Sequence, residues 1–139
     1  MTYNIKKIDS LYEYLRKSKC IAEWKKASFR GSNKKCVVTK RVNDLEIHHL
    51  NKPFKAIVKE ALEELNLEQK WKVSDYTQEE LLLIQLKVKD LHKKHGYGVV
   101  MHKRIHNLLH KEYGMQPTKE EFYEFKRNFI YKKYSAVCR

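Results

Sequence analysis

The chain contains very few residues that interrupt a helix. Glycine occurs four times and proline twice in 139 residues, whereas loop-rich β-sheet proteins need both residues in many turns. Apolar side chains make up 42% of the sequence and charged side chains 34%, which is too apolar a composition for a disordered chain. The length is typical of one domain. These features predict a mostly helical globular protein with one compact core.

Two helical stretches are predicted in the first half of the chain. Apolar residues fall near helical spacing from residue 10 to about residue 29, where Ser10 is placed to cap the helix and Gly31 to end it. This stretch forms one long helix or two short ones. A second amphipathic stretch begins directly after Pro53 and runs to about residue 65, because proline is favoured at helix starts.

Two Thr-x-x-Glu capping boxes mark the starts of later helices, at Thr77 with Glu80 and at Thr118 with Glu121. The first of these helices runs to about residue 95, and the second ends near Tyr134. Residues 98–101 form a short extended lead-in to a further helix, which covers about residues 103–113 and is ended by Gly114. The second half is therefore also mostly helical.

A small amount of β-structure is predicted between the helices. Residues 36–39 and 45–48 are short segments rich in β-branched or apolar side chains, and the polar residues 40–44 between them suit a turn. We expect these two segments to form a β-hairpin. Together with the helices, the hairpin gives an α+β fold class.

The positive charge is concentrated in the two outer parts of the sequence. The formal net charge is +13. Residues 1–49 carry 12 basic and 5 acidic side chains, residues 50–95 carry 9 and 8, and residues 96–139 carry 9 and 4. We expect the outer segments to meet in space and form one basic face, for which nucleic acid is the obvious partner. The alternative is an ordinary solvated surface.

No membrane span, secretion signal or disulfide framework is predicted. The longest apolar run covers residues 81–84, far short of the ~20 residues that a membrane span needs. The three cysteines, Cys20, Cys36 and Cys138, form no CxxC pair, and their number is odd. We therefore expect an intracellular protein with reduced thiols and without a Cys-rich zinc site.

The placement of the histidines is the strongest chemical signal. His48 and His49 close the second extended segment, and His102, His106 and His110 recur every four residues along one predicted helix. Histidines four apart on a helix lie about 5–6 Å apart at Cβ, so they can converge on a metal ion or a phosphate. A helical HxxxH pair alone is usually an ordinary surface or core feature, but a strand-end His-His pair strengthens the signal.

Two segments that carry these histidines resemble HNH endonucleases of the ββα-metal class, and most closely the small phage-type, homing-like members. They are GSNKKCVVTKRVNDLEIHHL at residues 31–50 and GVVMHKRIHNLLHKEY at residues 98–113. The resemblance extends to TKEEFYEF at residues 118–125, which is similar to the helix that often follows the nuclease motif in that group.

The resemblance implies a single HNH nuclease domain over residues 1–139, mostly helical and built around the ββα-metal (His-Me finger) motif. Its parts are an N-terminal helical segment, the hairpin with the His-His pair, a helical insert, the catalytic helix and a C-terminal helix, at residues 1–30, 31–50, 51–97, 98–114 and 115–139 respectively. The insert lies between the hairpin and the catalytic helix, and its near-neutral charge and apolar faces indicate a scaffolding role.

Position by position, the resemblance makes His49 the general base that removes a proton from the water attacking the scissile phosphate. Imidazole suits this role because its ordinary pKa is near ~6.5. His48 and His106 match the metal ligands. His110 matches a second helical histidine that binds the metal or contacts phosphate. The family's middle Asn is replaced by Tyr97, so the brace of the loop that carries the base must differ.

Other polar residues near the motif are less clearly assigned. Asn51 and Asn107 are candidates to replace the missing Asn. His92, His95 and His102 have no counterpart in the family, and we expect them at the surface or at helix ends. Six basic residues are expected to contact the DNA backbone: Arg30, Lys34, Lys35, Lys103, Arg104 and Lys111.

The expected cofactor is one divalent metal ion. Imidazole ligands accept nickel, cobalt, manganese or zinc as well as magnesium, and cellular abundance favours magnesium. The sequence and the resemblance together predict a cytoplasmic, phage- or prophage-encoded endonuclease that hydrolyses phosphodiester bonds in DNA with the help of a metal. The alternatives are a catalytically silent DNA-binding protein and an RNA-binding or phage accessory protein that uses the same basic face.

Overall fold

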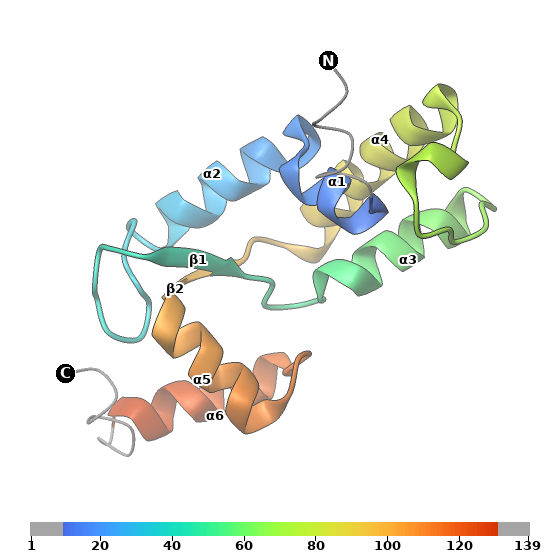
Figure 1. Ribbon diagram of the computed structural model, residues 1–139. Helices are drawn as coiled ribbons and strands as arrows, with labels where there is room; N and C mark the ends of the chain where they lie inside the picture. Colours follow the sequence, from blue (N-terminus) through green and yellow to red (C-terminus); the bar gives the residue numbers. More distant parts are fainter. Residues whose placement is uncertain (1–9, 131–139) are drawn as a thin grey trace. The chain divides into compact units, whose positions relative to one another are not determined.

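The computed structural model describes residues 10–130 and confirms a mostly helical α+β fold (Figure 1). The chain divides into two compact units. We call Met1–Trp24 with Phe54–His95 the helical unit, and Lys25–Pro53 with Gly96–Arg139 the histidine unit. Each has its own cluster of buried apolar side chains, so the expectation of one compact core was wrong.

The helical unit is made of helices alone within its described residues. They are α1 Leu11–Lys17, a 3-10 turn Lys19–Ile21, the start of α2 Ala22–Gly31, α3 Phe54–Glu64, a 3-10 turn Val73–Asp75 and α4 Gln78–His95. The stretch that begins at Ser10 therefore forms two helices, and the Ser10 side chain caps the first by accepting a hydrogen bond from the Glu13 backbone N–H at 3.1 Å. Helix α2 continues into the histidine unit.

Helices α3 and α4 pack against each other and supply most of the core of the helical unit. The capping box that opens α4 is formed in both directions, from the Thr77 N–H to Glu80 at 2.8 Å and from the Glu80 N–H to Thr77 at 3.0 Å. The first residue of α3 lies close to the end of α4, since the rings of Phe54 and His92 are 6.0 Å apart. The chain therefore leaves and re-enters this unit at neighbouring points.

The histidine unit contains the two-stranded sheet. Its elements after α2 are β1 Leu45–His48, β2 Val99–His102, α5 Lys103–Tyr113 and α6 Lys119–Ile130. The strands are antiparallel, with Leu45 opposite His102 and His48 opposite Val99. Helix α5 starts directly after β2, and α6 opens on the predicted capping box of Thr118 and Glu121. The predicted end of this last helix near Tyr134 lies outside the described residues.

The predicted hairpin between residues 36–39 and 45–48 was wrong. The partner of β1 is β2, more than fifty residues further along the chain. Residues 36–41 instead form a tight turn, in which the Cys36 N–H donates to the Arg41 carbonyl and Lys40 has a φ of +67°. This turn covers the edge of β2, because the Val37 N–H donates to the Val100 carbonyl.

The correct topology is strand, strand, helix, with residues 54–95 inserted between the two strands rather than between a hairpin and the helix. The insertion point is tightly built. Gly96 has a φ of +88°, and a Cβ on this residue would lie 2.9 Å from the Asn51 side-chain nitrogen. Glycine is therefore required where the chain returns to the sheet.

None of the helices in residues 10–130 is both long enough and apolar enough to cross a lipid bilayer.

Candidate metal centre

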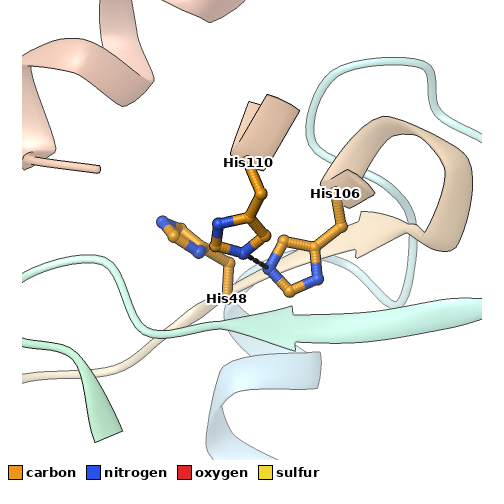
Figure 2. A group of neighbouring side chains, drawn as sticks. All are labelled: His48, His106 and His110. Atoms are coloured by element: carbon orange, nitrogen blue, oxygen red, sulfur yellow. Dashed lines mark hydrogen bonds between the residues drawn. The ribbon is translucent and has the colours of Figure 1, made fainter. Parts of the chain in front are cut away.

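Three histidines converge where strand β1 ends beside helix α5. His48 is the last residue of β1, and His106 and His110 lie one turn apart on α5. Each ring offers one nitrogen, and these three nitrogens all lie within 4.8 Å of one another. Figure 2 shows the rings of His106 and His110 facing each other, with the ring of His48 beside that of His110. The structure thus brings together the three predicted metal ligands, and the cluster could hold a metal ion.

His48 is held rigidly in the interior of the unit. Its side chain is only 5% exposed, and its ring stacks on Phe122 of α6 at a centroid distance of 5.8 Å. Its Nε2 atom is buried without a hydrogen-bond partner. Burial, and then the neighbouring His106 and His110, lower the pKa of His48 to about 3. The ring is therefore neutral at physiological pH, which is the form that binds metals.

His106 is oriented by a carboxylate. Its Nδ1 lies 2.9 Å from a carboxylate oxygen of Glu46, which is on strand β1. Since a carboxylate only accepts, Nδ1 carries the proton in the neutral ring and Nε2 keeps its lone pair. Burial lowers the pKa of His106, although the hydrogen bond to Glu46 opposes the shift. A carboxylate behind a histidine in this way is typical of metal-binding histidines.

His110 is also held through its Nδ1 atom, in this case by a backbone carbonyl. Its Nδ1 lies 3.0 Å from the carbonyl oxygen of Gly114, just after the end of α5. The carbonyl also only accepts, so the proton again sits on Nδ1 and the lone pair on Nε2. The Nε2 atoms of His106 and His110 are 3.0 Å apart (Figure 2).

These contacts leave an excess of lone pairs at the centre of the cluster. With both Nδ1 atoms engaged as donors, the hydrogen bond between the two Nε2 atoms needs an added proton, and a bound cation would replace that proton. In His48 the Nε2 atom is buried without a hydrogen-bond partner, which is costly in a folded protein. A shared metal ion would satisfy lone pairs of the helical pair and of His48.

The donor set fits a transition metal with a partly open coordination sphere. Zinc bound at about 2.1 Å from each nitrogen holds its ligands roughly 3.4 Å apart, so the present spacing of up to 4.8 Å requires only a small contraction. Three imidazole nitrogens favour zinc, nickel or cobalt over magnesium, which prefers oxygen ligands. Three protein ligands leave further positions for water or substrate, as in catalytic zinc sites.

His49 lies next to this centre but outside the group of three. It directly follows β1 and is partly buried, and adjacent residues of an extended chain point to opposite faces. Tyr97, at the position where HNH endonucleases have Asn, is exposed. Of the two candidates to replace that Asn, Asn51 lies against Gly96 at the insertion point, whereas Asn107 is exposed on α5.

The six predicted DNA-contacting residues all belong to the histidine unit, and all are exposed. Arg30 lies near the end of α2, Lys34 and Lys35 follow it, and the other three are on α5: Lys103, Arg104 and Lys111. The histidine unit has 17 basic and 6 acidic residues and the helical unit 13 and 11. Of the total charge of +13, the histidine unit thus carries +11.

The remaining histidines have structural roles. His102 caps α5 by accepting a hydrogen bond from the Arg104 N–H, and His95 lies 2.8 Å from Glu60 at the end of α4. Both fit the expected helix-end role. His92 does not, because it is buried in the helical unit, with its ring against Trp24 and its Nδ1 2.8 Å from the Val88 carbonyl.

Two residues of the centre were missed by the sequence analysis. Glu46 lies two positions before His48 on the same strand, and residues two apart in a strand share a face. That spacing could have identified Glu46 as a partner of the cluster. No comparable signal pointed to Phe122, because a helical apolar residue such as this is normally read as ordinary core.

Comparison with known proteins gives a partial similarity. The chain is 41% identical over 61 residues to the SPbeta prophage-derived uncharacterized protein YomD of Bacillus subtilis (strain 168). The match covers 44% of this chain and 22% of that protein. No protein-family model matches the chain. No solved structure matches it either.

Proposed function

We propose that this protein is a metal-dependent endonuclease that hydrolyses phosphodiester bonds in DNA by HNH-type chemistry. The observation that carries the proposal is the convergence of His48, His106 and His110 at the junction of two antiparallel strands and a helix, with a buried His48 nitrogen that lacks a partner. The strand, strand, helix order is the one that the ββα-metal resemblance implies. The partial similarity to a prophage-derived protein agrees with a phage-type member.

In this proposal His49 is the general base. It directly follows the metal ligand His48, the last residue of β1, so it is adjacent in the chain to the centre while remaining outside the group of three ligands. It accepts the proton of the water that attacks the phosphorus atom. A positioned proton acceptor of this kind typically contributes about 10²- to 10⁴-fold to the rate.

The three ligand histidines bind and orient, and Glu46 fixes the ring of His106. When bound, the divalent ion polarises the phosphoryl oxygen and stabilises the charge that develops on the leaving 3′ oxygen. Nitrogen ligands bind magnesium weakly, so magnesium would occupy the site only because it is abundant in cells.

The charge of the histidine unit supports DNA as the substrate. This unit carries a net charge of +11, and the predicted contact residues on α5, Lys103, Arg104 and Lys111, are close in sequence to the ligands. Phosphate contacts of this kind position the backbone without reading sequence.

The test is cleavage of supercoiled plasmid with defined metals. We expect nicking or linearisation with at least one of zinc, nickel, cobalt, manganese or magnesium, and none with EDTA. His49→Ala should lower the rate by about 10²- to 10⁴-fold with every metal and leave metal and DNA binding intact. His95→Gln removes an imidazole from the helical unit and serves as the control, with unchanged cleavage.

The ligand variants should fail differently. His48→Ala and His106→Ala should weaken metal binding, so part of their lost activity returns at high metal concentration. If His49→Ala were rescued by excess metal and His48→Ala were not, the two roles would be reversed. DNA binding without cleavage under any metal would instead support the catalytically silent DNA-binding protein.

A further inference from the structure

Helix α4 is apolar on two opposite faces. Leu81, Ile84 and Val88 are buried in the core of the helical unit. At about 100° per residue, three other leucines point the opposite way, and they are half-exposed: Leu82 at 56%, Leu83 at 50% and Leu86 at 50%. We call these three residues the leucine patch.

The leucine patch is unusual for a water-facing surface. Single exposed leucines are common, but three on adjacent turns of one helix form a continuous apolar surface that typically marks an interaction site. None of the three belongs to either cluster of packed apolar side chains among the described residues. The opposite face of α4 already supplies the core, so the patch is not needed to hold the helical unit together.

The charges that border the patch differ at its two ends. On the same face, Glu79 lies one turn before it, and Lys89, Asp90 and Lys93 follow it, so the net charge is negative before the patch and positive after it. An acidic end and a basic end on one helix face are complementary to the same face run in the opposite direction. If Leu82 of one copy lies opposite Leu86 of another, the antiparallel register places Glu79 opposite Lys89.

We propose that two copies of this chain associate through the leucine patches of α4 in this antiparallel, two-fold symmetric register. A symmetric pair forms each contact twice, so the leucines pack in the centre and two Glu79 to Lys89 ion pairs flank them. The small apolar area indicates a weak dimer, with dissociation at micromolar or higher concentrations.

The same features disfavour other occupants of the patch. Glu79 at one end of the patch would repel DNA and anionic lipid headgroups, and at the other end Asp90 offsets part of the charge of Lys89 and Lys93. The helical unit as a whole carries a net charge of only +2. A second copy offers leucines that cover the patch and charged residues of opposite sign at its two ends.

The first experiment is sedimentation velocity on the full chain over a wide range of concentrations at low salt. We expect a monomer–dimer equilibrium in the wild type. Leu82→Glu with Leu86→Glu should be monomeric at every concentration, with an unchanged circular dichroism spectrum. Val42→Glu is the matched control, because Val42 is an exposed apolar residue (67%) of the histidine unit, and it should dimerise like the wild type.

The register is tested by exchanging charges. Glu79→Lys and Lys89→Glu should each weaken the dimer by about tenfold, because symmetry turns two attractive pairs into repulsive ones. The double exchange should restore the wild-type dissociation constant. A wild type that is monomeric throughout, a dimer that survives both glutamates in the patch, or a double exchange without recovery would each overturn the proposal. The readout is mass alone, so the result does not depend on nuclease activity.

Discussion

The two units of this protein use their interiors in different ways. Among the described residues, the helical unit packs thirteen buried apolar residues into one cluster, whereas the cluster of the histidine unit has six. The histidine unit buries His48 and His102, the helical unit buries His92, and the net charges of the two units are +11 and +2 respectively. Apolar packing therefore dominates the helical unit, whereas the histidine unit combines a smaller apolar cluster with the histidine cluster and a strong positive charge.

The largest expected effect comes from cavities in the two cores. Ile84→Ala and Leu109→Ala each remove a fully buried side chain, from the helical and the histidine unit respectively, and each should lower the free energy of unfolding by about 2–5 kcal/mol. Under conditions where both variants stay folded, Ile84→Ala should keep its zinc affinity, whereas Leu109→Ala should lose affinity because α5 carries two of the ligands. Denaturant unfolding and zinc titration calorimetry measure the two quantities.

Equal zinc affinities in these two variants would show that the interiors are not as distinct as the comparison states. Zinc affinity would then depend on the packing of both units and not on that of the histidine unit alone.

A smaller effect, of opposite sign, is expected at His48. His48→Leu replaces a buried imidazole that has an unpartnered nitrogen with an apolar side chain of similar size. Without metal, the free energy of unfolding should rise by about 1–3 kcal/mol, the cost of an unsatisfied buried polar group. Zinc should no longer raise the melting temperature of this variant, whereas at a zinc concentration of about 100 Kd it should stabilise the wild type by about 2.7 kcal/mol.

The measurement is thermal unfolding with and without zinc. A metal-free His48→Leu that is less stable than the wild type would mean that His48 is held by interactions that satisfy it without an ion.

The smallest effect concerns the charge difference between the units. Lys34→Ala with Lys35→Ala should lower the slope of log affinity for DNA against log salt by about 2, because each lost phosphate contact removes about 0.9. Lys59→Ala with Lys72→Ala is the matched pair in the helical unit, and it should leave the slope nearly unchanged. Fluorescence anisotropy with a labelled duplex gives both slopes, and equal losses from the two pairs would contradict a DNA interface confined to the histidine unit.

Helix boundaries were predictable from the sequence because their signals are local. The capping boxes at Thr77 and Thr118 and the stop at Gly114 act within one turn of the helix that they bound, and the structure has helices at these places. The strand pairing was not predictable in this way. Residues 36–39 contain three β-branched side chains and residues 99–102 only two. Local preference therefore favours the wrong segment, and contacts between distant parts of the chain decide which of them pairs with β1.

The three histidines of the cluster could be predicted from the sequence, but the groups that orient and pack against them could not. His106 and His110 share a helix face by spacing alone, and His48 was brought in by the resemblance. Glu46 was missed, although its spacing from His48 on β1 could have identified it. The Gly114 carbonyl and the ring of Phe122 reach the cluster only through the end of α5 and the packing of α6, which no local pattern encodes.

The insertion of α3 and α4 between the two strands has a consequence for how the metal centre assembles. The ligands come from both sides of the insert, so pairing β1 with β2 closes a loop, which for a flexible chain of this length costs about 3 kcal/mol of entropy. Here the loop is itself folded, and its ends are near each other: Phe54 lies by His92 in the helical unit, and Asn51 lies by Gly96 in the histidine unit. The folded pair of helices α3 and α4 thus holds the end of β1 near the start of β2. The three histidines are brought together with the help of a segment that contributes none of them.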